Sequence, residues 1–232
     1  GEEAILTVAR QVKAAGAHAL RGGAFKPRTN PYSFQGHGED GLKMLAAARA
    51  ETGLPIITEV LTPGDVELVA KYADCLQIGT RNAQNFQLII AAAKTGKPVL
   101  LKRGMSMRIM EWLLAGEYVL ANRNPNLLFC ERGIRTFENY TRNTLDLSAV
   151  AVVKAESHCP IVVDPSQGCG KAELVHSMCR GAVAMGADAL LIEVHPNPAE
   201  AMSDAAQQID LEGFAVLIEE LLPIAESAGR EL

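Results

Sequence analysis

The strongest constraint on the fold of this chain is a regular alternation of short apolar runs with longer helical stretches. Seven apolar runs have the length and near-continuous hydrophobicity of buried parallel strands: 17–21, 55–60, 75–80, 98–103, 127–132, 160–164 and 189–195. Helical periodicity follows each of them, at 38–51, 63–72, 83–95, 109–121, 145–157, 171–185 and 212–226, and a further helix at 2–15 precedes the first run. This pattern predicts an α/β protein, either an open doubly wound sheet or a (β/α)8 barrel.

The residues at the carboxyl ends of the predicted strands favour the barrel. Each end carries a polar or charged residue: Arg21, Glu59, Arg81, Lys102, Glu131, Asp164 and Glu193. A closed barrel brings all strand ends to one face, whereas an open sheet concentrates its chemistry at one switch point. We therefore predict a single barrel domain over residues 1–232 that lacks its first strand and carries no regulatory domain. Either the first strand precedes Gly1, or there is no such strand and the barrel is open between its neighbours.

Composition narrows the class of protein. The 232 residues are 48% hydrophobic, which suffices for a sizeable core, and the net charge of −5 argues against nucleic acid as a partner. The amino terminus lacks the features of a signal peptide and no apolar run has transmembrane length, so we expect a cytoplasmic protein without a membrane partner. Five cysteines without a CxxC pair indicate reduced, buried thiols.

Cations gather in the segments that follow the predicted strands. Residues 20–34 place Arg21, Lys26 and Arg28 beside two glycines, a composition typical of an anion clamp, although a solvated basic loop is the alternative. The other cations at strand ends are Arg81, Lys102, Arg103, Arg132 and Arg135. Cations concentrated in an acidic protein attract polyanionic ligands. The competing interpretation is that they form ion pairs with the strand-end carboxylates.

A second pattern lies near the last strand. Glu193 and His195 are two residues apart on the predicted strand and would point to one face, and Asp204 follows in a loop. Carboxylates with a nearby imidazole can hold a divalent cation. A purely structural pair is the alternative.

Several motifs, in order along nearly the whole chain, carry a family resemblance. They are residues 21–34, 77–85 (QIGTRNAQN), 100–104 (LLKRG), 131–137 (ERGIRTF), 141–148 (TRNTLDLS), 163–166, and 192–196 (IEVHP) with Ser203 and Asp204. Together they resemble the type I 3-deoxy-D-arabino-heptulosonate 7-phosphate (DAHP) synthases, of the subfamily that includes relatives of the octulosonate phosphate synthases. The resemblance implies a (β/α)8 transferase. It further implies the condensation of phosphoenolpyruvate with erythrose 4-phosphate, the first step of the shikimate pathway to aromatic amino acids.

The resemblance also implies roles for individual residues. Phosphoenolpyruvate would be held by Arg21, Lys26, Arg81, Lys102 and Arg132, of which Lys26, Lys102 and Arg132 are the expected catalytic residues. Erythrose 4-phosphate would be held by Arg28 and Thr29.

The family's divalent metal, Mn or else Fe, Co or Zn, would be bound by Glu193 and Asp204. Two further family ligands are not matched. The family Cys would lie upstream of Gly1, and Gln167 stands where the family has a His. An amide oxygen is a weaker donor than imidazole, so we expect at best a weakly held metal. Cys169 either substitutes as a ligand or is a buried thiol.

Two alternatives remain open at this level. One is a related 3-deoxy sugar-acid phosphate synthase that uses another phosphorylated aldose. The other is a metal-poor, weakly active paralogue with a binding or regulatory role. The family resemblance also predicts a homo-oligomer, a dimer or a tetramer.

Overall fold

A computed structural model describes residues 1–27 and 30–230 of the chain. The chain forms two compact units. Unit 1 comprises Gly1–Leu101 and Leu114–Leu127, and unit 2 comprises Lys102–Leu113 and Leu128–Leu232. The single domain expected from the sequence stays a prediction.

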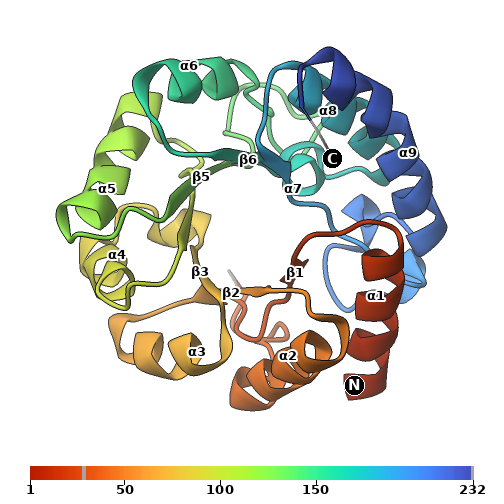
Figure 1. The fold of residues 1–232 in the computed structure, drawn as a ribbon, viewed down its shortest axis with the longest axis horizontal. Helices are drawn as coiled ribbons and strands as arrows, with labels where there is room; N and C mark the ends of the chain where they lie inside the picture. The colour runs from red at the N-terminus through yellow and green to blue at the C-terminus, as the bar shows by residue number, and fades with distance from the viewer. Residues whose placement is uncertain (28–29, 231–232) are drawn as a thin grey trace. The chain divides into compact units, whose positions relative to one another are not determined.

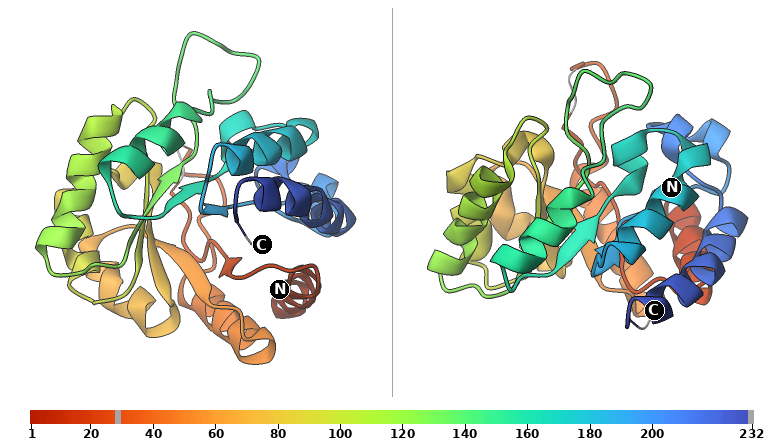
Figure 2. Two further views of the ribbon diagram at one scale, coloured as in Figure 1. Left: turned by 45° about the horizontal axis from the view of Figure 1, so that its top comes forward. Right: turned by 90° about the horizontal axis from the view of Figure 1, so that it is seen from above.

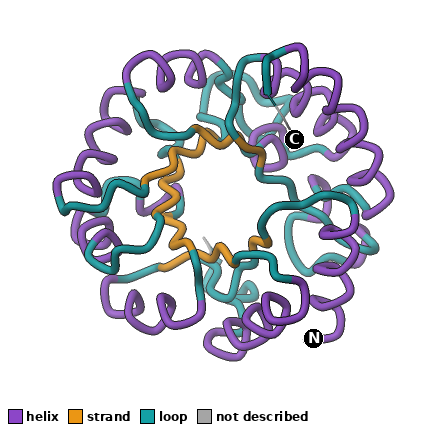
Figure 3. The backbone as a smooth tube through the Cα atoms, viewed as in Figure 1, coloured by secondary structure: helices purple, strands orange, loops and turns teal. Residues whose placement is uncertain are grey.

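Unit 1 is built on parallel strands that follow one another in chain order. They are β1 (Leu20–Arg21), β2 (Ile56–Val60), β3 (Cys75–Ile78) and β4 (Val99–Lys102), with register pairs such as Leu20↔Ile56, Ile57↔Cys75 and Leu76↔Val99. The last residue of β4, Lys102, belongs to unit 2. Its helices are α1 (Glu2–Ala14), α2 (Gly38–Thr52), α3 (Val66–Tyr72) and α4 (Phe86–Ala93), with the 3-10 turns η1 (Pro63–Asp65) and η2 (Thr80–Asn82). Helices α2 and α3 cover one face of these strands (Figures 1 and 3).

Unit 2 repeats the same arrangement. Its strands are β5 (Leu127–Glu131), β6 (Ile161–Val163) and β7 (Ala189–Leu190), paired in parallel with registers such as Phe129↔Ile161 and Val162↔Ala189. Its helices are α6 (Ser148–Glu156), α7 (Pro165–Cys169), α8 (Ala172–Ala184) and α9 (Leu211–Ser227), with η3 (Pro198–Glu200) and η4 (Ala205–Gln207). Helix α5 (Ile109–Ala121) contributes its first turn to unit 2 and its remainder to unit 1.

Aromatic packing anchors the core of unit 2. Trp112 and Phe129 are both buried and meet edge to face, with ring centroids 5.0 Å apart. The guanidinium of Arg103 lies over the Trp112 ring at 5.9 Å, within the range of a cation–π contact. This packing fixes Arg103 beside the carboxyl end of β5.

The loop that joins β5 to α6 projects away from the strands of unit 2 (Figure 2). It is tied at its base by an isolated antiparallel bridge between Ile134 and Thr144. Gly133 begins this loop with a φ of +90°, and a Cβ there would lie 2.6 Å from Cβ of Asn143, so the turn requires glycine.

All seven predicted strands are confirmed, but the first and the last are shorter than expected. β7 ends at Leu190, and so the prediction that Glu193 and His195 share a strand face is wrong. The reason lies in its neighbour. β6 ends at Val163, and Asp164 caps helix α7, a helix that the sequence pattern did not predict. Without a continuing partner strand, the chain after Leu191 turns to bond the backbone of Ile209 instead.

The cysteine prediction is confirmed, since all five are free and buried. Burial raises the pKa of the Cys75 and Cys130 thiols to about 12, so these thiols stay protonated. Among the described residues, no helix combines the length and the apolar character needed to cross a membrane.

Candidate active site

Unit 1 holds one of the predicted phosphoenolpyruvate residues in a partly buried polar network. Arg21, the last residue of β1, donates from Nε to Oε1 of Gln77 at 3.1 Å and from Nη2 to Oε2 of Glu59 at 3.4 Å. Gln77 in turn donates from Nε2 to the same Glu59 oxygen at 3.1 Å. Part of the predicted cation set is thus ion-paired, as the alternative interpretation of the strand ends required. The network also fixes the direction of the Arg21 guanidinium.

Gly79 makes room for this network at the end of β3. A Cβ at this position would lie 2.0 Å from Oε1 of Glu59, closer than any side chain tolerates. The next residue, Thr80, has a buried hydroxyl without a hydrogen-bond partner in the part of the chain that the structure describes. Arg81 follows in η2 and is exposed, whereas Lys26 is half-buried in the loop after β1. Arg28 and Thr29, the predicted erythrose 4-phosphate residues, lie outside the described residues.

In unit 2, Lys102 at the end of β4 is buried and ion-paired. Its Nζ lies 2.6 Å from Oδ2 of Asp164, whose carboxylate is fully buried. The other oxygen, Oδ1, accepts from the backbone N–H of Gln167 at 2.9 Å and caps helix α7. One carboxylate thus orients both the ammonium and the turn that carries Gln167.

Arg103 belongs to a separate, structural cluster. Its Nη1 donates to Glu131 at 2.9 Å and to Asp146 at 2.8 Å, and its Nε donates to the carbonyl of Met107 at 2.9 Å. Burial raises the pKa of Glu131 against the opposing effect of Arg103, and the hydrogen bonds from Arg103 and Ser148 outweigh burial to lower that of Asp146. The sequence reading placed Arg103 among the anion-binding cations. The structure instead gives it two carboxylate partners.

Arg132 differs from Arg103 because its guanidinium is incompletely paired. Its side chain is buried, and Nη2 donates to Oε1 of Gln167 at 2.7 Å. Nη1 is also buried, yet it has no hydrogen-bond partner among the described residues. Burial lowers the pKa of Arg132, and the nearby Asp164 opposes that effect. A buried guanidinium nitrogen with an open donor is suited to bind an anion.

From Arg132, a continuous hydrogen-bonded chain leads through the predicted metal ligands. Gln167 donates from Nε2 to Oε1 of Glu193 at 2.7 Å, and Gln207 donates from Nε2 to Oε2 of Glu193 at 3.0 Å. Arg142 then donates from Nη1 to Oε1 of Gln207 at 2.7 Å and to Oδ1 of Asp204 at 2.9 Å. The predicted residues Glu193, Asp204 and Gln167 are therefore brought into one network.

As arranged, these residues do not fit a metal ion. Both oxygens of Glu193 face amide N–H groups, and the Asp204 carboxylate is ion-paired with Arg142. Across residues 1–27 and 30–230, no group of three or more His, Cys, Asp or Glu side chains is placed to hold a metal. His195 accepts at Nδ1 from the backbone N–H of Asn197, and the Cys169 thiol is buried against the carbonyl of Pro165. The buried-thiol interpretation of Cys169 is confirmed.

The sequence reading missed Arg142 and Gln207, which complete the network. Arg142 lies in the motif TRNTLDLS and its Cβ packs over Gly170, where any Cβ would come within 2.3 Å of it. Its place inside a quoted motif was the available signal. Gln207 is buried and had no sequence signal, because its partners come from distant segments.

Comparison with known proteins identifies the family. The model of the family described as DAHP synthetase I matches residues 1–226. The chain belongs to the DAHP synthetase I family.

Individual proteins are similar to this chain over most of its length. The chain is 49% identical over 229 residues to a phospho-2-dehydro-3-deoxyheptonate aldolase of Thermotoga maritima, covering 99% of this chain and 68% of that protein. It is 35% identical over 210 residues to a 2-dehydro-3-deoxyphosphooctonate aldolase of Fusobacterium nucleatum, covering 85% of this chain and 73% of that protein. A crystal structure of the Thermotoga maritima DAHP synthase has a TM-score of 0.97 at 48% identity, covering 100% of this chain and 68% of that one. The predicted fold class, a (β/α)8 barrel, is confirmed by this likeness, and the absence of its first strand from this chain stays a prediction.

Proposed function

We propose that this protein condenses phosphoenolpyruvate with erythrose 4-phosphate, giving DAHP and inorganic phosphate. It would thus be a transferase of aromatic amino acid biosynthesis. Family membership supports the reaction class. The observation within the structure that carries the proposal is the open donor of Arg132.

Leaving a buried polar group without a partner costs about 1–3 kcal/mol, and more when the group is charged. In the part of the chain that the structure describes, Nη1 of Arg132 bears this cost in a side chain that is only 6% exposed. A phosphate or carboxylate oxygen would remove it and would gain a charge-assisted hydrogen bond. Phosphoenolpyruvate, a three-carbon molecule, carries both a phosphate and a carboxylate.

The remaining assignments follow the resemblance and stay proposals. Arg21, Lys26, Arg81 and Lys102 would hold phosphoenolpyruvate together with Arg132, and Arg28 and Thr29 would hold erythrose 4-phosphate. In unit 2, Asp164 and Gln167 position Lys102 and Arg132 before substrate arrives. Prepositioned donors of this kind stabilise developing negative charge without reorganising.

The reaction balances without an added oxidant or reductant. The enol carbon of phosphoenolpyruvate forms a carbon–carbon bond to the aldehyde carbon of erythrose 4-phosphate, and the aldehyde oxygen takes up a proton. Water then adds at the cationic C2, and the bond from C2 to the phosphate oxygen breaks, releasing phosphate. The cationic Lys102 and Arg132 would stabilise charge on the aldehyde oxygen and on the leaving phosphate.

Members of this family generally depend on a metal. Mn, or else Fe, Co or Zn, was predicted for this chain, but both carboxylate oxygens of Glu193 accept hydrogen bonds from the amides of Gln167 and Gln207. The dimer or tetramer and the cytoplasmic location expected from the sequence remain predictions.

The second candidate differs in its aldose. The octonate name of several relatives at 31–35% identity describes an eight-carbon product, which requires a five-carbon phosphorylated aldose beside the three carbons of phosphoenolpyruvate. The higher identity to the heptonate enzyme favours the four-carbon aldose for this chain.

Phosphate release with phosphoenolpyruvate and each aldose tests the proposal. We expect turnover with erythrose 4-phosphate and much slower turnover with a phosphorylated pentose. Preference for the pentose would support the octulosonate alternative. If neither aldose reacts while phosphoenolpyruvate still raises the melting temperature, the protein is a binding or regulatory paralogue.

A further inference from the structure

The network around Glu193 points to a property that differs from the metal dependence expected of the family. We infer that this chain replaces the divalent cation with the amides of Gln167 and Gln207, and that it binds no resident metal at Glu193 and Asp204. The corollary, a condensation that needs no metal, rests on the proposed function.

The direction of both amides is fixed by their outer partners. A guanidinium group has five donors and no acceptor, so the amide that meets it must present its oxygen. Gln167 meets Arg132 in this way and Gln207 meets Arg142, each at 2.7 Å. Each amide consequently turns its NH₂ group toward Glu193.

This arrangement leaves Glu193 with an N–H donor on each oxygen. The distances are 2.7 Å to Gln167 and 3.0 Å to Gln207. A cation at this carboxylate would lie against two groups of partially positive hydrogens. To supply oxygen instead, either amide would have to flip and turn its NH₂ against an arginine, exchanging a good hydrogen bond for donor–donor repulsion.

Charge balance favours the same conclusion. The network contains two carboxylates, Glu193 and Asp204, and two guanidinium groups, Arg132 and Arg142, so its charges cancel. Asp204 is directly paired with Arg142 at 2.9 Å. A divalent cation added here would leave an excess of positive charge in a partly buried site, which opposes its binding.

Titration of the protein with Mn²⁺ after dialysis against a chelator tests the inference without using activity. Electron paramagnetic resonance measures the free ion. We expect the free Mn²⁺ signal to rise in proportion to the added ion, with no saturable site. One saturable Mn²⁺ per chain in the unaltered protein would overturn the inference.

The variant Gln167→Glu tests whether the amide of Gln167 is what keeps a metal ion from Glu193. It keeps the shape of the side chain but turns an oxygen toward Glu193, so a pair of facing carboxylates replaces an amide–carboxylate contact. We expect a saturable Mn²⁺ site to appear, with at least a tenfold gain in affinity. The matched control is Gln208→Glu, because the Gln208 amide donates to the carbonyl of Ser203 rather than to Glu193. Absence of Mn²⁺ binding in a folded Gln167→Glu variant would contradict the blocking role of the amide.

Circular dichroism checks that the variant folds, and Gln207→Glu makes the equivalent change at the other oxygen of Glu193 if it does not. Turnover of the unaltered protein with and without chelator tests the corollary, and we expect equal rates. If no condensation occurs under any condition, the proposed function fails while the Mn²⁺ titration still decides the inference. If a chelator abolishes turnover, the metal-free reaction is wrong.

Discussion

At the residue scale, Arg132 gives the sharpest test of ligand binding. Arg132→Lys keeps the positive charge but removes Nη1, which has no partner within residues 1–27 and 30–230, and the fork geometry that suits phosphate. We expect kcat/KM for phosphoenolpyruvate to fall about 10- to 150-fold, which corresponds to about 1.5–3 kcal/mol for a lost charged hydrogen bond. Arg108→Lys changes an exposed arginine of the same unit and should have no effect.

A binding measurement separates this role from a structural one. Phosphoenolpyruvate should raise the melting temperature of the unaltered protein and of the control, but raise it much less in Arg132→Lys. Equal protection of all three proteins would show that Nη1 of Arg132 does not contact the ligand.

Lys102 supports a second prediction at this scale. Lys102→Ala should lower kcat/KM by roughly 30- to 1,000-fold, because loss of one charged donor to a developing oxyanion costs roughly 2–4 kcal/mol. It should also destabilise the fold, since the fully buried Asp164 loses its ion-pair partner.

The double variant Lys102→Ala with Asp164→Asn distinguishes the two effects. It removes the buried charge, so urea unfolding should show partial recovery of the free energy of unfolding. Steady-state kinetics should show no recovery of activity. If the double variant recovered both the free energy of unfolding and the activity, the role of Lys102 would be structural.

At the scale of single elements, the end of β3 is shaped by one glycine. Gly79→Ala would place a methyl group 2.0 Å from Oε1 of Glu59 and push that carboxylate away from Arg21 and Gln77. We expect a loss of about 1–3 kcal/mol in the free energy of unfolding, the usual cost of forced overpacking. Chemical denaturation measures it.

Gly64→Ala is the matched control, because the nearest atom to its added Cβ is Oγ1 of Thr62 at 3.7 Å. Its free energy of unfolding should change little. A Gly79→Ala variant as stable as this control would mean that Glu59 can move at no cost, and the Arg21 network would then not be rigid.

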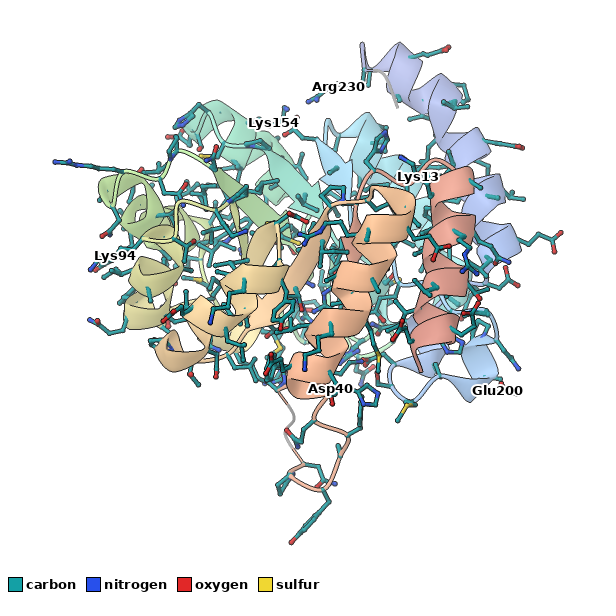
Figure 4. The ribbon with its side chains drawn as sticks, turned by 60° about the horizontal axis from the view of Figure 1, so that its bottom comes forward. Lys13, Asp40, Lys94, Lys154, Glu200 and Arg230 are labelled. Atoms are coloured by element: carbon teal, nitrogen blue, oxygen red, sulfur yellow. The ribbon has the colours of Figure 1, made fainter. Side chains whose placement is uncertain are left out.

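At the scale of the whole chain, both units use one device at the amino ends of their strands. Asp74 precedes β3 and accepts from the N–H of Ile56 at 2.8 Å, and Asp188 precedes β7 and accepts from the N–H of Ile161 at 2.9 Å. Each carboxylate also has cationic partners, Arg49 for Asp74 and, for Asp188, Lys154 and Arg230, which are labelled in Figure 4.

This device predicts how stability depends on pH. Burial raises the pKa of each aspartate, but the backbone and cation contacts outweigh it, so the folded-state pKa lies below the unfolded value of about 3.9. The stability that the two groups contribute is therefore present above that pH and is lost as pH falls through the lower folded-state pKa. Urea unfolding at a series of acidic pH values measures it.

Variants assign this acid sensitivity. Asp74→Asn and Asp188→Asn should each be less stable at neutral pH and lose less stability on acidification. Asp40→Asn changes a solvent-facing aspartate of α2 (Figure 4) and should leave the slope unchanged. Burial raises the pKa of Glu131, so Glu131 affects the pH dependence of stability in the opposite sense. Because every variant retains Glu131, its effect cancels when the variants are compared. Identical slopes in all of them would assign the acid sensitivity to other carboxylates.

Several features could be read from the sequence because they depend on local pattern. The seven strands follow from apolar runs of strand length, and helix α5 lies at Ile109–Ala121, as its periodicity predicts. A polar residue lies at or shortly after the carboxyl end of every strand. Parallel strands bring these ends to one edge of the sheet, so this pattern predicted where the site lies. The motifs could identify the family because each of them is a short contiguous run and so depends on local sequence alone.

Tertiary structure decided which of these polar groups are open to a ligand and which are already paired. Arg103 and Arg132 both end apolar runs, yet Arg103 meets two carboxylates, whereas Arg132 keeps a donor that no described residue accepts. The sequence predicted that Gln167 is a weak metal ligand. Because Arg132 can only donate hydrogen bonds, the amide oxygen of Gln167 faces Arg132 and the amide hydrogens of Gln167 face Glu193. The direction of a hydrogen bond depends on the partners that distant segments bring to it, and no local pattern contains that information.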